Sequence, residues 1–478
     1  MFSSLTRDVI RRAALHTHGA AGPSGMDADG WRRMCTAFSE ASDELCDSLA
    51  TCARRIATTY VNPATLEALV ACRLIALDKS PGVRPIGIGE VARRIVGKAI
   101  LTVTGRDIQD AAGTLQLCAG QECGIEAAIH AMQDVYREED ADAILLADAS
   151  NAFNRLNREA CLRNIRHLCP SIAPAVINTY RQPSRLFVDG ECLLSCEGTT
   201  QGDPLAMPVY ALGVLPLIKK VAVPGAKQGW YADDAAAGGK LTPVRQWWDN
   251  LVSQGPGYGY HCNAQKSLLL VKPSRYAAAI EMFEGTGVQV TCDGCRHLGA
   301  PLGTDEFIEQ FVQSKVATWC EEVAQLTTIA ASQPQAAYSA FTQGLQNKWS
   351  FLCRTSSIPP SLLEPLEHAI SGRLIPAITG QAPPGTTVRS LLSLPCRLGG
   401  LGMADPCSVA EQYTSSRRIT ASLVSRLLEQ ESSLGDSLTQ LRTVKATVRA
   451  EKRSAFKSMA DALRSDHRKL APILDLAS

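Results

Sequence analysis

The sequence predicts an α+β protein, in which a mixed body of strands and helices is followed by a mainly helical region. The apolar stretch AILLA, residues 143–147, ends at Asp148 and is typical of a buried strand. A second stretch, QGWYADDAAAGG, indicates a strand, a turn and another strand. From about Glu306 the pattern becomes mainly helical, broken by TGQAPPGTT and LPCRLGGLG.

The segments before the buried strand change type in turn. HGAAGPSGMDADGW, residues 18–31, is a loop punctuated by glycine and proline, and a mostly helical segment follows over residues 32–71. CRLIALDKSPGVRPIGIG then indicates two strands joined by a Ser-Pro-Gly turn. EVARRIVGKAILTVTGRDIQDA and GIEAAIHAMQDVYREEDA are expected helices. The first of these helices separates apolar from basic side chains, with Val91, Ile95 and Ala99 on one face and Arg93, Arg94 and Lys98 on the other.

Hairpins and helices alternate after the buried strand. SRLFVDGECLLSCEG indicates a hairpin around an Asp-Gly turn. QGDPLAMPVYALGVLPLIKKV indicates a helix, and TPVRQWWDNLVSQGPGYGY indicates a helix closed by glycines. The two candidate strand regions are therefore separated by a helix, a hairpin and another helix.

The composition is that of a globular protein with a sizeable core. The chain has 478 residues, of which 45% are hydrophobic and 20% charged. These values exclude a disordered chain and allow about two to four structural units. Lys and Arg number 48 against 47 Asp and Glu. This balance argues against a nucleic-acid partner, although acidic and basic faces can be segregated. The C-terminal run TVKATVRAEKRSAFKSMADALRSDHRKL is locally basic, and a solvated helix face is its simplest interpretation.

The sequence predicts an intracellular protein with reduced cysteines and no membrane partner. The N-terminus lacks the apolar core of a secretion signal, and the longest apolar run, Ala206–Ile218, is too short to cross a bilayer. The 17 cysteines are scattered through the chain. Cys292, Cys295 and His297 lie close together, but no second ligand pair follows, so a turn with reduced thiols is expected instead of a zinc site. Nothing distinguishes the nucleus from the cytoplasm.

Three carboxylates are the strongest candidates for chemistry. Asp148 ends an apolar strand, where a carboxylate is costly to desolvate, and Asp233 and Asp234 lie in the second strand region. If the two strands pair, the three carboxylates converge, and hard oxygen ligands suit Mg²⁺. Two such ions about 4 Å apart can activate a 3′-hydroxyl and stabilise a leaving pyrophosphate. In the structural alternative, Asp148 caps the following helix and Asp233-Asp234 is a polar turn.

Six motifs, in order, resemble those of reverse transcriptases. RLIALDKSPGVRPIG resembles the fingers strands, ADASNAFNRL the first catalytic motif, and GTTQGDPLAMPVYAL the Gln-Gly-x-Pro-Leu motif. YADD resembles the second catalytic motif, GYHCNAQKSLLL the motif with a functional lysine, and RHLGAPLG the primer grip. GPSGMDADGW and LPCRLGGLG are most similar to segments of non-LTR (LINE-type) retrotransposon enzymes. The resemblance spans residues 22–410, and group II intron maturases are a second relative.

The resemblance implies a right-hand polymerase with fingers, a palm whose antiparallel sheet holds the catalytic Asp residues, and a helical thumb. The expected divisions are a helical lead-in (1–70), fingers (71–135), a palm with an inserted fingers hairpin (136–305), and the thumb with a C-terminal extension (306–478). The implied activity is RNA-directed DNA polymerisation with two Mg²⁺ ions, for which Mn²⁺ is expected to substitute. The implied partners are an RNA template, a DNA primer and deoxynucleoside triphosphates.

The resemblance also assigns roles to single residues. Asp148 and Asp233 are the expected Mg²⁺ ligands, supported by Asp234, and Lys266 is expected to protonate the leaving pyrophosphate. The expected nucleotide-binding residues are Lys79, Arg84, Phe153, Gln201 and Gly202, and the expected primer grip is Leu298 and Gly299. Phe153 would lie beneath the incoming sugar and clash with a 2′-hydroxyl. The basic helix face, Arg93, Arg94 and Lys98, would follow the template backbone.

Plain structural alternatives remain for several of these roles. Phe153 would be a core side chain, Lys79 and Arg84 part of a solvated hairpin, and Lys266 a surface lysine. Asn154 also departs from the family, where Asp is common, although that position is not a metal ligand.

Other functions stay open at the level of the whole chain. An RNA-dependent RNA polymerase is disfavoured, because those enzymes usually have Gly-Asp-Asp and because Phe153 opposes ribonucleotides. No endonuclease signature accompanies the polymerase motifs, so the sequence is expected to be either part of a longer element protein or a catalytically silent, decayed or domesticated nucleic-acid-binding remnant.

Overall fold

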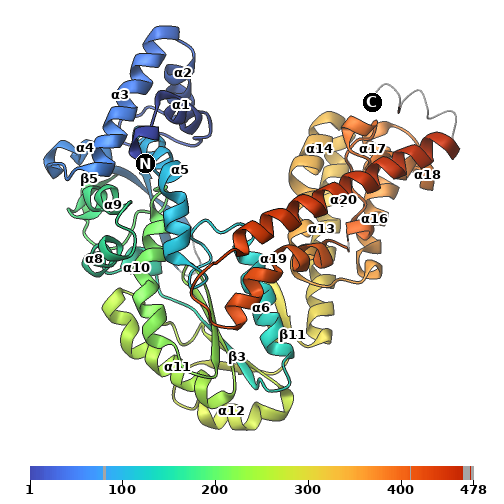
Figure 1. Cartoon of the computed structure of the whole chain (residues 1–478). Coiled ribbons are helices and arrows are strands. Elements are labelled where there is room, and N and C mark those ends of the chain that lie inside the picture. The colour runs from blue at the N-terminus through green and yellow to red at the C-terminus, as the bar shows by residue number, and fades with distance from the viewer. Residues whose placement is uncertain (79–81, 410, 467–473, 475–478) are drawn as a thin grey trace.

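A five-stranded sheet occupies the centre of the molecule, in the order β6-β7-β3-β8-β9 (Figure 1). The computed structural model describes residues 1–78, 82–409, 411–466 and 474. Neighbouring strands are antiparallel except for β8 and β9. The strands are β3 (Ala143–Ala147), β6 (Ala226–Tyr231), β7 (Asp234–Gly239), β8 (Leu268–Val271) and β9 (Gln289–Thr291). The chain is 61% helix and 13% strand, so the predicted α+β class is confirmed.

Both faces of the central sheet are covered, which explains the unbroken apolar run of β3. Successive side chains of a strand point to opposite faces. Leu145 joins the cluster formed with the helices α8 to α11, whereas Ile144 joins the cluster formed with α6, α19 and the start of α20. These helices are α6 (Gly124–Arg137), α8 (Arg158–Leu168), α9 (Ala173–Tyr180), α10 (Ala206–Val221), α11 (Leu241–Gln254), α19 (Gln412–Leu428) and α20 (Ser437–Asp466).

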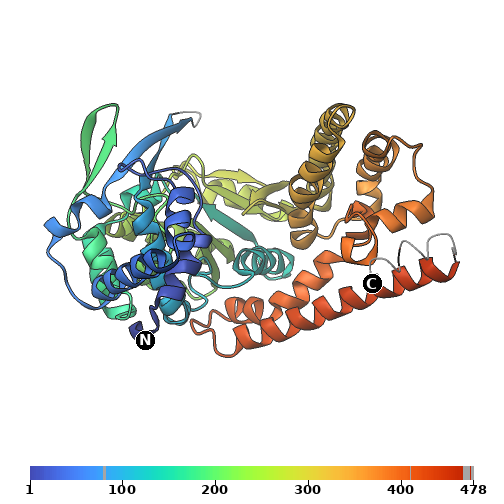
Figure 2. The ribbon, with the colours of Figure 1, turned by 90° about the horizontal axis from the view of Figure 1, so that it is seen from above.

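A second sheet consists of two hairpins that project from the body side by side (Figure 2). Its strand order is β2-β1-β4-β5, and the predicted hairpins are confirmed. Strand β1 pairs with β4 in parallel, which joins two hairpins far apart in the chain. The strands are β1 (Cys72–Asp78), β2 (Val83–Gly89), β4 (Ser184–Val188) and β5 (Glu191–Ser195). Much of their length is exposed on both faces.

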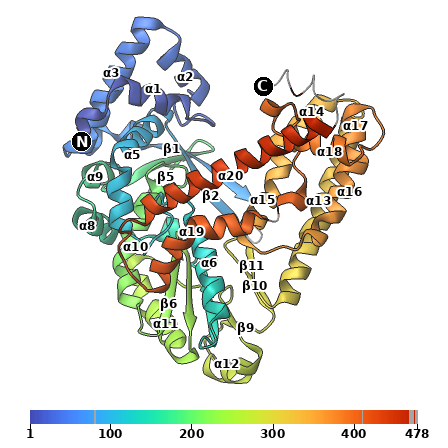
Figure 3. The ribbon, with the colours of Figure 1, turned by 45° about the vertical axis from the view of Figure 1, so that its right-hand side comes forward.

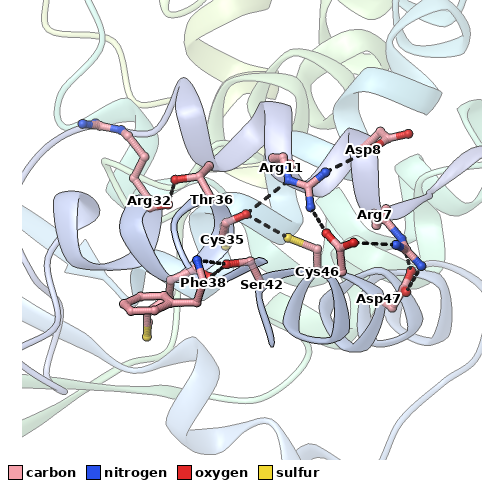
Figure 4. A network of polar contacts seen from close by, with 12 residues as sticks. Arg7, Asp8, Arg11, Arg32, Cys35, Thr36, Phe38, Ser42, Cys46 and Asp47 are labelled. Atoms are coloured by element: carbon pink, nitrogen blue, oxygen red, sulfur yellow. Dashed lines mark hydrogen bonds and ion pairs between the residues drawn. The ribbon is translucent and has the colours of Figure 1, made fainter. Parts of the chain in front are cut away.

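The N-terminal helices form a separate apolar cluster with α5 (Val91–Ala112). They are α1 (Arg7–Leu15), α2 (Ala28–Thr36), α3 (Ser39–Thr58) and the short α4 (Glu67–Val70). Figure 4 shows the polar contacts that join the first three helices. Arg7 bonds Asp43 at 3.0 Å and Asp47 at 2.7 Å, and Arg11 also pairs with Asp43. Ser42 accepts the N–H of Phe38, which closes the turn between α2 and α3.

The C-terminal part of the chain forms a helical lobe and then returns to the central sheet. Helices α13 to α18 surround their own cluster, with Trp319 and Trp349 inside. They are α13 (Asp305–Ala330), α14 (Pro334–Ala340), α15 (Gln346–Thr355), α16 (Glu364–Ala369), α17 (Ile375–Thr379) and α18 (Thr386–Ser393). Helix α19 then lies along α6, and α20 crosses from α19 toward α18 (Figure 3). The predicted division near residue 305 falls at the start of α13, but α19 belongs by packing to the sheet.

The remaining elements are short and lie near the sheet. They are α7 (Ala152–Arg155), α12 (Tyr276–Met282), β10 (Gly294–His297) and β11 (Ala300–Gly303). Among the described residues, no helix is long and apolar enough to cross a membrane. The 17 cysteines all lie in described segments and are free thiols, and within those segments His, Cys, Asp and Glu side chains form no group of three that could hold a metal. The thiols of Cys292 and Cys295 are among these free cysteines.

Candidate active site

The YADD stretch forms a tight hairpin between β6 and β7. Tyr231 pairs with Asp234, which leaves Ala232 and Asp233 as a two-residue turn. Ala232 has φ +55°, a left-handed conformation that a two-residue hairpin turn requires. The turn therefore places Asp233 at the end of the hairpin.

The expected pairing of the two carboxylate strands is confirmed. Strand β3 runs antiparallel to β7, with Ala147 opposite Ala235. The same register continued by one residue sets Asp148 opposite Asp234, next to Asp233. Burial, followed by the negative charges of Asp233 and Asp148, raises the pKa of Asp234 to about 6, although much of the residue is open to solvent. The three carboxylates are therefore close enough to act on one another.

Two side chains that the sequence did not single out hold the YADD turn. The fully buried Gln116 bonds Ala232 twice, accepting its N–H at 2.7 Å and donating to its carbonyl at 3.0 Å. The hydroxyl of Tyr260 donates to the carbonyl of Asp233 at 2.9 Å. Neither residue has a local sequence signal, because each acts on a segment far away in the chain.

The backbone of Asp148 is held by the segment that precedes β8. The Asp148 N–H donates to Ser267 Oγ at 3.1 Å, and its carbonyl accepts the N–H of Asn263 at 2.8 Å. Ser267 Oγ in turn donates to the Asn263 carbonyl at 2.8 Å. Lys266 is exposed in this same turn, immediately before Ser267, so the predicted lysine lies on the segment that supports Asp148.

Phe153 lies on α7 and stacks on Tyr210 of α10, with ring centroids 4.4 Å apart. Its carbonyl accepts the N–H of Thr199 at 2.7 Å, which ties α7 to the loop before α10. Phe153 is half-buried and keeps a partly open face, whereas Tyr210 is fully buried. Burial raises the pKa of Tyr210, and the charges of Asp233 and Asp234 raise it further. Tyr210 therefore stacks on Phe153 and lies near enough to the carboxylate turn for the charges of Asp233 and Asp234 to act on it.

Gln201 and Gly202 lie in the turn before α10, against strand β2. Gly202 has φ +106°, and a Cβ there would stand 3.0 Å from the carbonyl oxygen of Gly87. Glycine is thus required both by the backbone conformation and by the close approach of β2. Arg84 lies on β2 three residues before Gly87 and is exposed. Lys79 lies outside the described residues.

The loop before α10 is anchored from both sides by buried cations. Arg93 pairs with Asp203 at 2.5 Å, and the hydroxyl of Tyr180 donates to the same carboxylate at 2.5 Å. Burial is the largest single influence and lowers the pKa of Arg93, but Asp203, Tyr180 and Cys72 together raise it, and the net shift is upward. On the other side, Arg158 donates to the carbonyls of Ser195, Glu197 and Gly198.

Arg158 was missed in the sequence, although it has one local signal. It is the first residue of α8, where a cation is unfavourable because of the helix dipole. A cation at such a position therefore indicates that it has compensating partners elsewhere in the protein.

The prediction that Arg93, Arg94 and Lys98 form one basic face of α5 is wrong. Arg93 is only 7% exposed because it faces Asp203 in the interior. Arg94 donates to the carbonyls of His18 and Ala20, and Lys98 donates to that of His16. These bonds fasten the loop after α1 to α5, so the three cations act within the protein instead of forming an open track for a phosphate backbone.

Leu298 and Gly299 form the two-residue turn of the β10–β11 hairpin, which confirms the expected hairpin. Both have positive φ, +48° and +94°, because a two-residue turn between antiparallel strands favours left-handed residues. A Cβ at Gly299 would stand 3.2 Å from the ring of Phe351. Leu298 and Tyr231 pack against the same apolar cluster, so the hairpin lies on the side of the sheet that holds α6.

The donors at the carboxylate end of the sheet suit a cation completed by a substrate. Mg²⁺ is usually bound by one or two carboxylates together with phosphates and water, and needs no cage made by the protein alone. Asp148 and Asp233 supply such oxygens, and their charges already disfavour ionisation of Asp234. These carboxylate oxygens have the chemistry that a divalent cation would need, although the His, Cys, Asp and Glu side chains of the described segments form no group of three that would hold one on their own.

Comparisons with known proteins add nothing to this arrangement: no protein-family model matches the chain, and no curated protein matches it significantly. The function has to be inferred from the residues and their geometry.

Proposed function

We propose that the chain is an RNA-directed DNA polymerase, a reverse transcriptase of the non-LTR retrotransposon type. The observation that carries the proposal is the register of β3 against β7, with Asp148 opposite Asp234 and beside the turn residue Asp233. Six ordered sequence motifs support the same activity. In this proposal the central sheet is the palm, the two projecting hairpins belong to the fingers, and α13–α18 are the thumb.

The proposed reaction extends a primer by one nucleotide. The 3′-oxygen of the primer bonds to the α-phosphorus of a deoxynucleoside triphosphate, the bond to pyrophosphate breaks, and the 3′-hydroxyl proton is lost. Asp148 and Asp233 would hold Mg²⁺, which when bound activates the hydroxyl and neutralises charge on the leaving group. Lys266 would give a proton to the departing pyrophosphate.

The remaining residues of the site would position the reactants. Gln116 and Tyr260 fix the backbone of the turn that presents Asp233. Phe153, supported by Tyr210, would lie against the sugar, and the Gln201-Gly202 loop would contact the base pair or nucleotide from the side of β2. Leu298 and Gly299 would hold the primer end. Such positioning supplies a large share of the barrier reduction in phosphoryl transfer.

Primer extension tests the proposal directly. The full chain is incubated with a DNA primer annealed to an RNA template, the four deoxynucleotides and Mg²⁺ or Mn²⁺. Wild type is expected to extend the primer, and Asp148→Asn or Asp233→Asn to lower the rate by at least about 100-fold. Asp29→Asn, on the exposed surface of α2, removes one carboxylate elsewhere and is expected to leave the rate unchanged.

The contrary result is equally plain. If wild type binds the primer–template but does not extend it with either metal, the polymerase assignment fails and a silent nucleic-acid-binding remnant takes its place.

A further inference from the structure

Helix α20 is buried against the rest of the protein at its two ends and is not buried along its middle. Leu438 and Leu441 are buried in the cluster shared with α6 and α19, and Ala460 and Leu463 are buried in a second cluster beside α18. Between Arg442 and Met459 none of its residues is buried. Figure 3 shows the helix crossing the molecule between these two anchoring regions.

The basic side chains of α20 divide into a set that forms ion pairs and an uncommitted set that forms none among the described residues. Arg442 and Lys445 pair with Glu122 at 3.1 and 2.7 Å, and Glu451 pairs with Arg418 of α19 at 2.9 Å. Asp461 pairs with Arg464 at 2.8 Å. The uncommitted set, called the α20 stripe below, consists of Arg449, Lys452, Arg453 and Lys457.

No carboxylate of the described residues forms an ion pair with any member of the α20 stripe, and all four members are exposed. Their spacing is helical: Arg449, Arg453 and Lys457 follow one another at four-residue intervals, with Lys452 beside them. At a rise of about 1.5 Å per residue the stripe is about 12 Å long. Lys452 lies over the ring of Phe456, its ammonium 5.7 Å from the centroid, which restrains its side chain.

A linear row of cations on a rigid helix fits a linear polyanion better than a small anion. A compact anion would need donors that converge on one point, whereas the α20 stripe spreads its four charges along a line. A nucleic-acid strand presents successive phosphates at a few ångströms' spacing, and flexible Arg and Lys side chains bind them without reading sequence. The net charge of the whole chain is only +1, so the basic surplus of the α20 stripe is a local feature and not a consequence of a basic overall composition.

We infer that the α20 stripe binds the phosphodiester backbone of a nucleic acid, at a surface separate from the carboxylate end of the sheet. Figure 2 shows α20 on the side of the molecule opposite the two projecting hairpins. A strand bound there lies outside the region between the hairpins and the helical lobe. The choice of a nucleic acid over another polyanion rests on the proposed polymerase function, but the surface itself does not need catalysis.

Salt-dependent binding tests the inference on the full chain. The variant Arg449→Gln/Lys452→Gln/Arg453→Gln/Lys457→Gln is compared with wild type for a fluorescein-labelled single-stranded RNA, and then for single-stranded and duplex DNA. Loss of four phosphate contacts is expected to reduce the magnitude of the slope of log K against log salt by about 3 for single strands. Near 50 mM salt, the variant is expected to bind at least about tenfold more weakly than wild type.

Matched variants separate the stripe from net charge and from folding. Arg33→Gln/Arg163→Gln/Arg166→Gln/Lys219→Gln removes four exposed cations elsewhere and is expected to keep the wild-type slope. Arg449→Lys/Arg453→Lys keeps the charges and is also expected to keep it. An unchanged slope in the stripe variant, or an equal loss in the control, overturns the inference.

Two further readouts distinguish the possible partners and the two proposals. If the stripe variant lost binding to vesicles containing phosphatidylserine but bound RNA as wild type does, the α20 stripe would be a membrane-binding surface and the nucleic-acid inference would be overturned. Primer extension by wild type is measured separately. If wild type shows no polymerase activity but the stripe variant has a smaller salt slope than wild type, the binding inference holds and the polymerase proposal fails. If wild type is active but the stripe variant keeps the wild-type slope, the polymerase proposal holds and the binding inference fails.

Discussion

Phe153 and Tyr210 stack nearly face to face, with ring centroids 4.4 Å apart and planes inclined by 20°. Phe153 belongs to the segment that follows Asp148, and Tyr210 belongs to the helix that follows Gln201 and Gly202. Their contact joins two proposed parts of the site, one that would hold metal and one that would hold nucleotide.

The proposed sugar contact of Phe153 is testable by substitution. Phe153→Val replaces the ring that would meet a 2′-hydroxyl with a smaller side chain. Incorporation of ribonucleotides should therefore rise relative to deoxynucleotides by at least about tenfold. The measurement is kcat/KM for each nucleotide type in primer extension. Phe38→Val, at an exposed position between α2 and α3, is the matched control. Unchanged discrimination in Phe153→Val would leave Phe153 as an ordinary packing residue.

The Tyr210 hydroxyl gives a prediction for stability. It is buried and has no hydrogen-bond partner among the described residues. Because an unpaired buried hydroxyl is costly, Tyr210→Phe should raise the free energy of unfolding by about 1 kcal/mol while keeping the stack on Phe153. Urea unfolding measures the change. Tyr210→Leu, which removes the stack, is expected to destabilise instead, and a loss of stability in Tyr210→Phe would mean that the hydroxyl has a partner such as bound water.

The buried pair of Arg93 and Asp203 should be far more important for stability than an exposed pair. Asp203→Ala leaves the Arg93 cation buried without its carboxylate and should cost about 3–5 kcal/mol. Asp249→Ala breaks the exposed pair with Arg245 on α11 and should cost less than about 0.5 kcal/mol. Both values come from denaturant unfolding. Similar costs for the two variants would contradict the role of Asp203 as an anchor.

Two buried histidines should make the protein sensitive to mild acid. Burial lowers the pKa of both His130 and His297 to about 4, from about 6.5. His130 bonds Thr420 and the Arg354 carbonyl, and near it Arg417 lowers the pKa while Asp134 raises it. The unfolded chain therefore binds protons first as pH falls, so stability is full above pH 6.5 and is lost between about 6.5 and 4.

The size of the acid effect follows from the pKa difference. Each histidine should cost about 2 kcal/mol of unfolding free energy on going from pH 7 to pH 5. Replacing His130 by Gln should lower overall stability at pH 7 but flatten the decline toward pH 5. A variant as acid-sensitive as wild type would show that His130 is not the titrating group.

The sequence predicted the local elements of the site well, because their signals are local. The apolar run before Asp148 and the alternation around YADD each specify a strand, and pairing of the two strands followed. The two positive-φ residues Leu298 and Gly299 likewise lie where a hairpin turn was expected.

Contacts between distant segments were not predictable in the same way. The helical pattern of α5 placed Arg93 on a polar face, but Asp203, far along the chain, draws it into the interior. Gln116 and Tyr260 support YADD from segments whose own sequence gives no hint of that target. Periodicity reports which side of a helix is polar, and it does not report which partner that side will meet.

The packing of α19 against α6 also has a consequence for synthesis of the protein. One face of the central sheet is covered by α6, whose outer side is in turn covered by α19 and the start of α20. On the ribosome, α6 is made long before α19, so its apolar surface stays uncovered while the whole helical lobe is translated. A chaperone that recognises exposed apolar helices would therefore find its substrate in the nascent chain until Leu423 and Leu427 emerge.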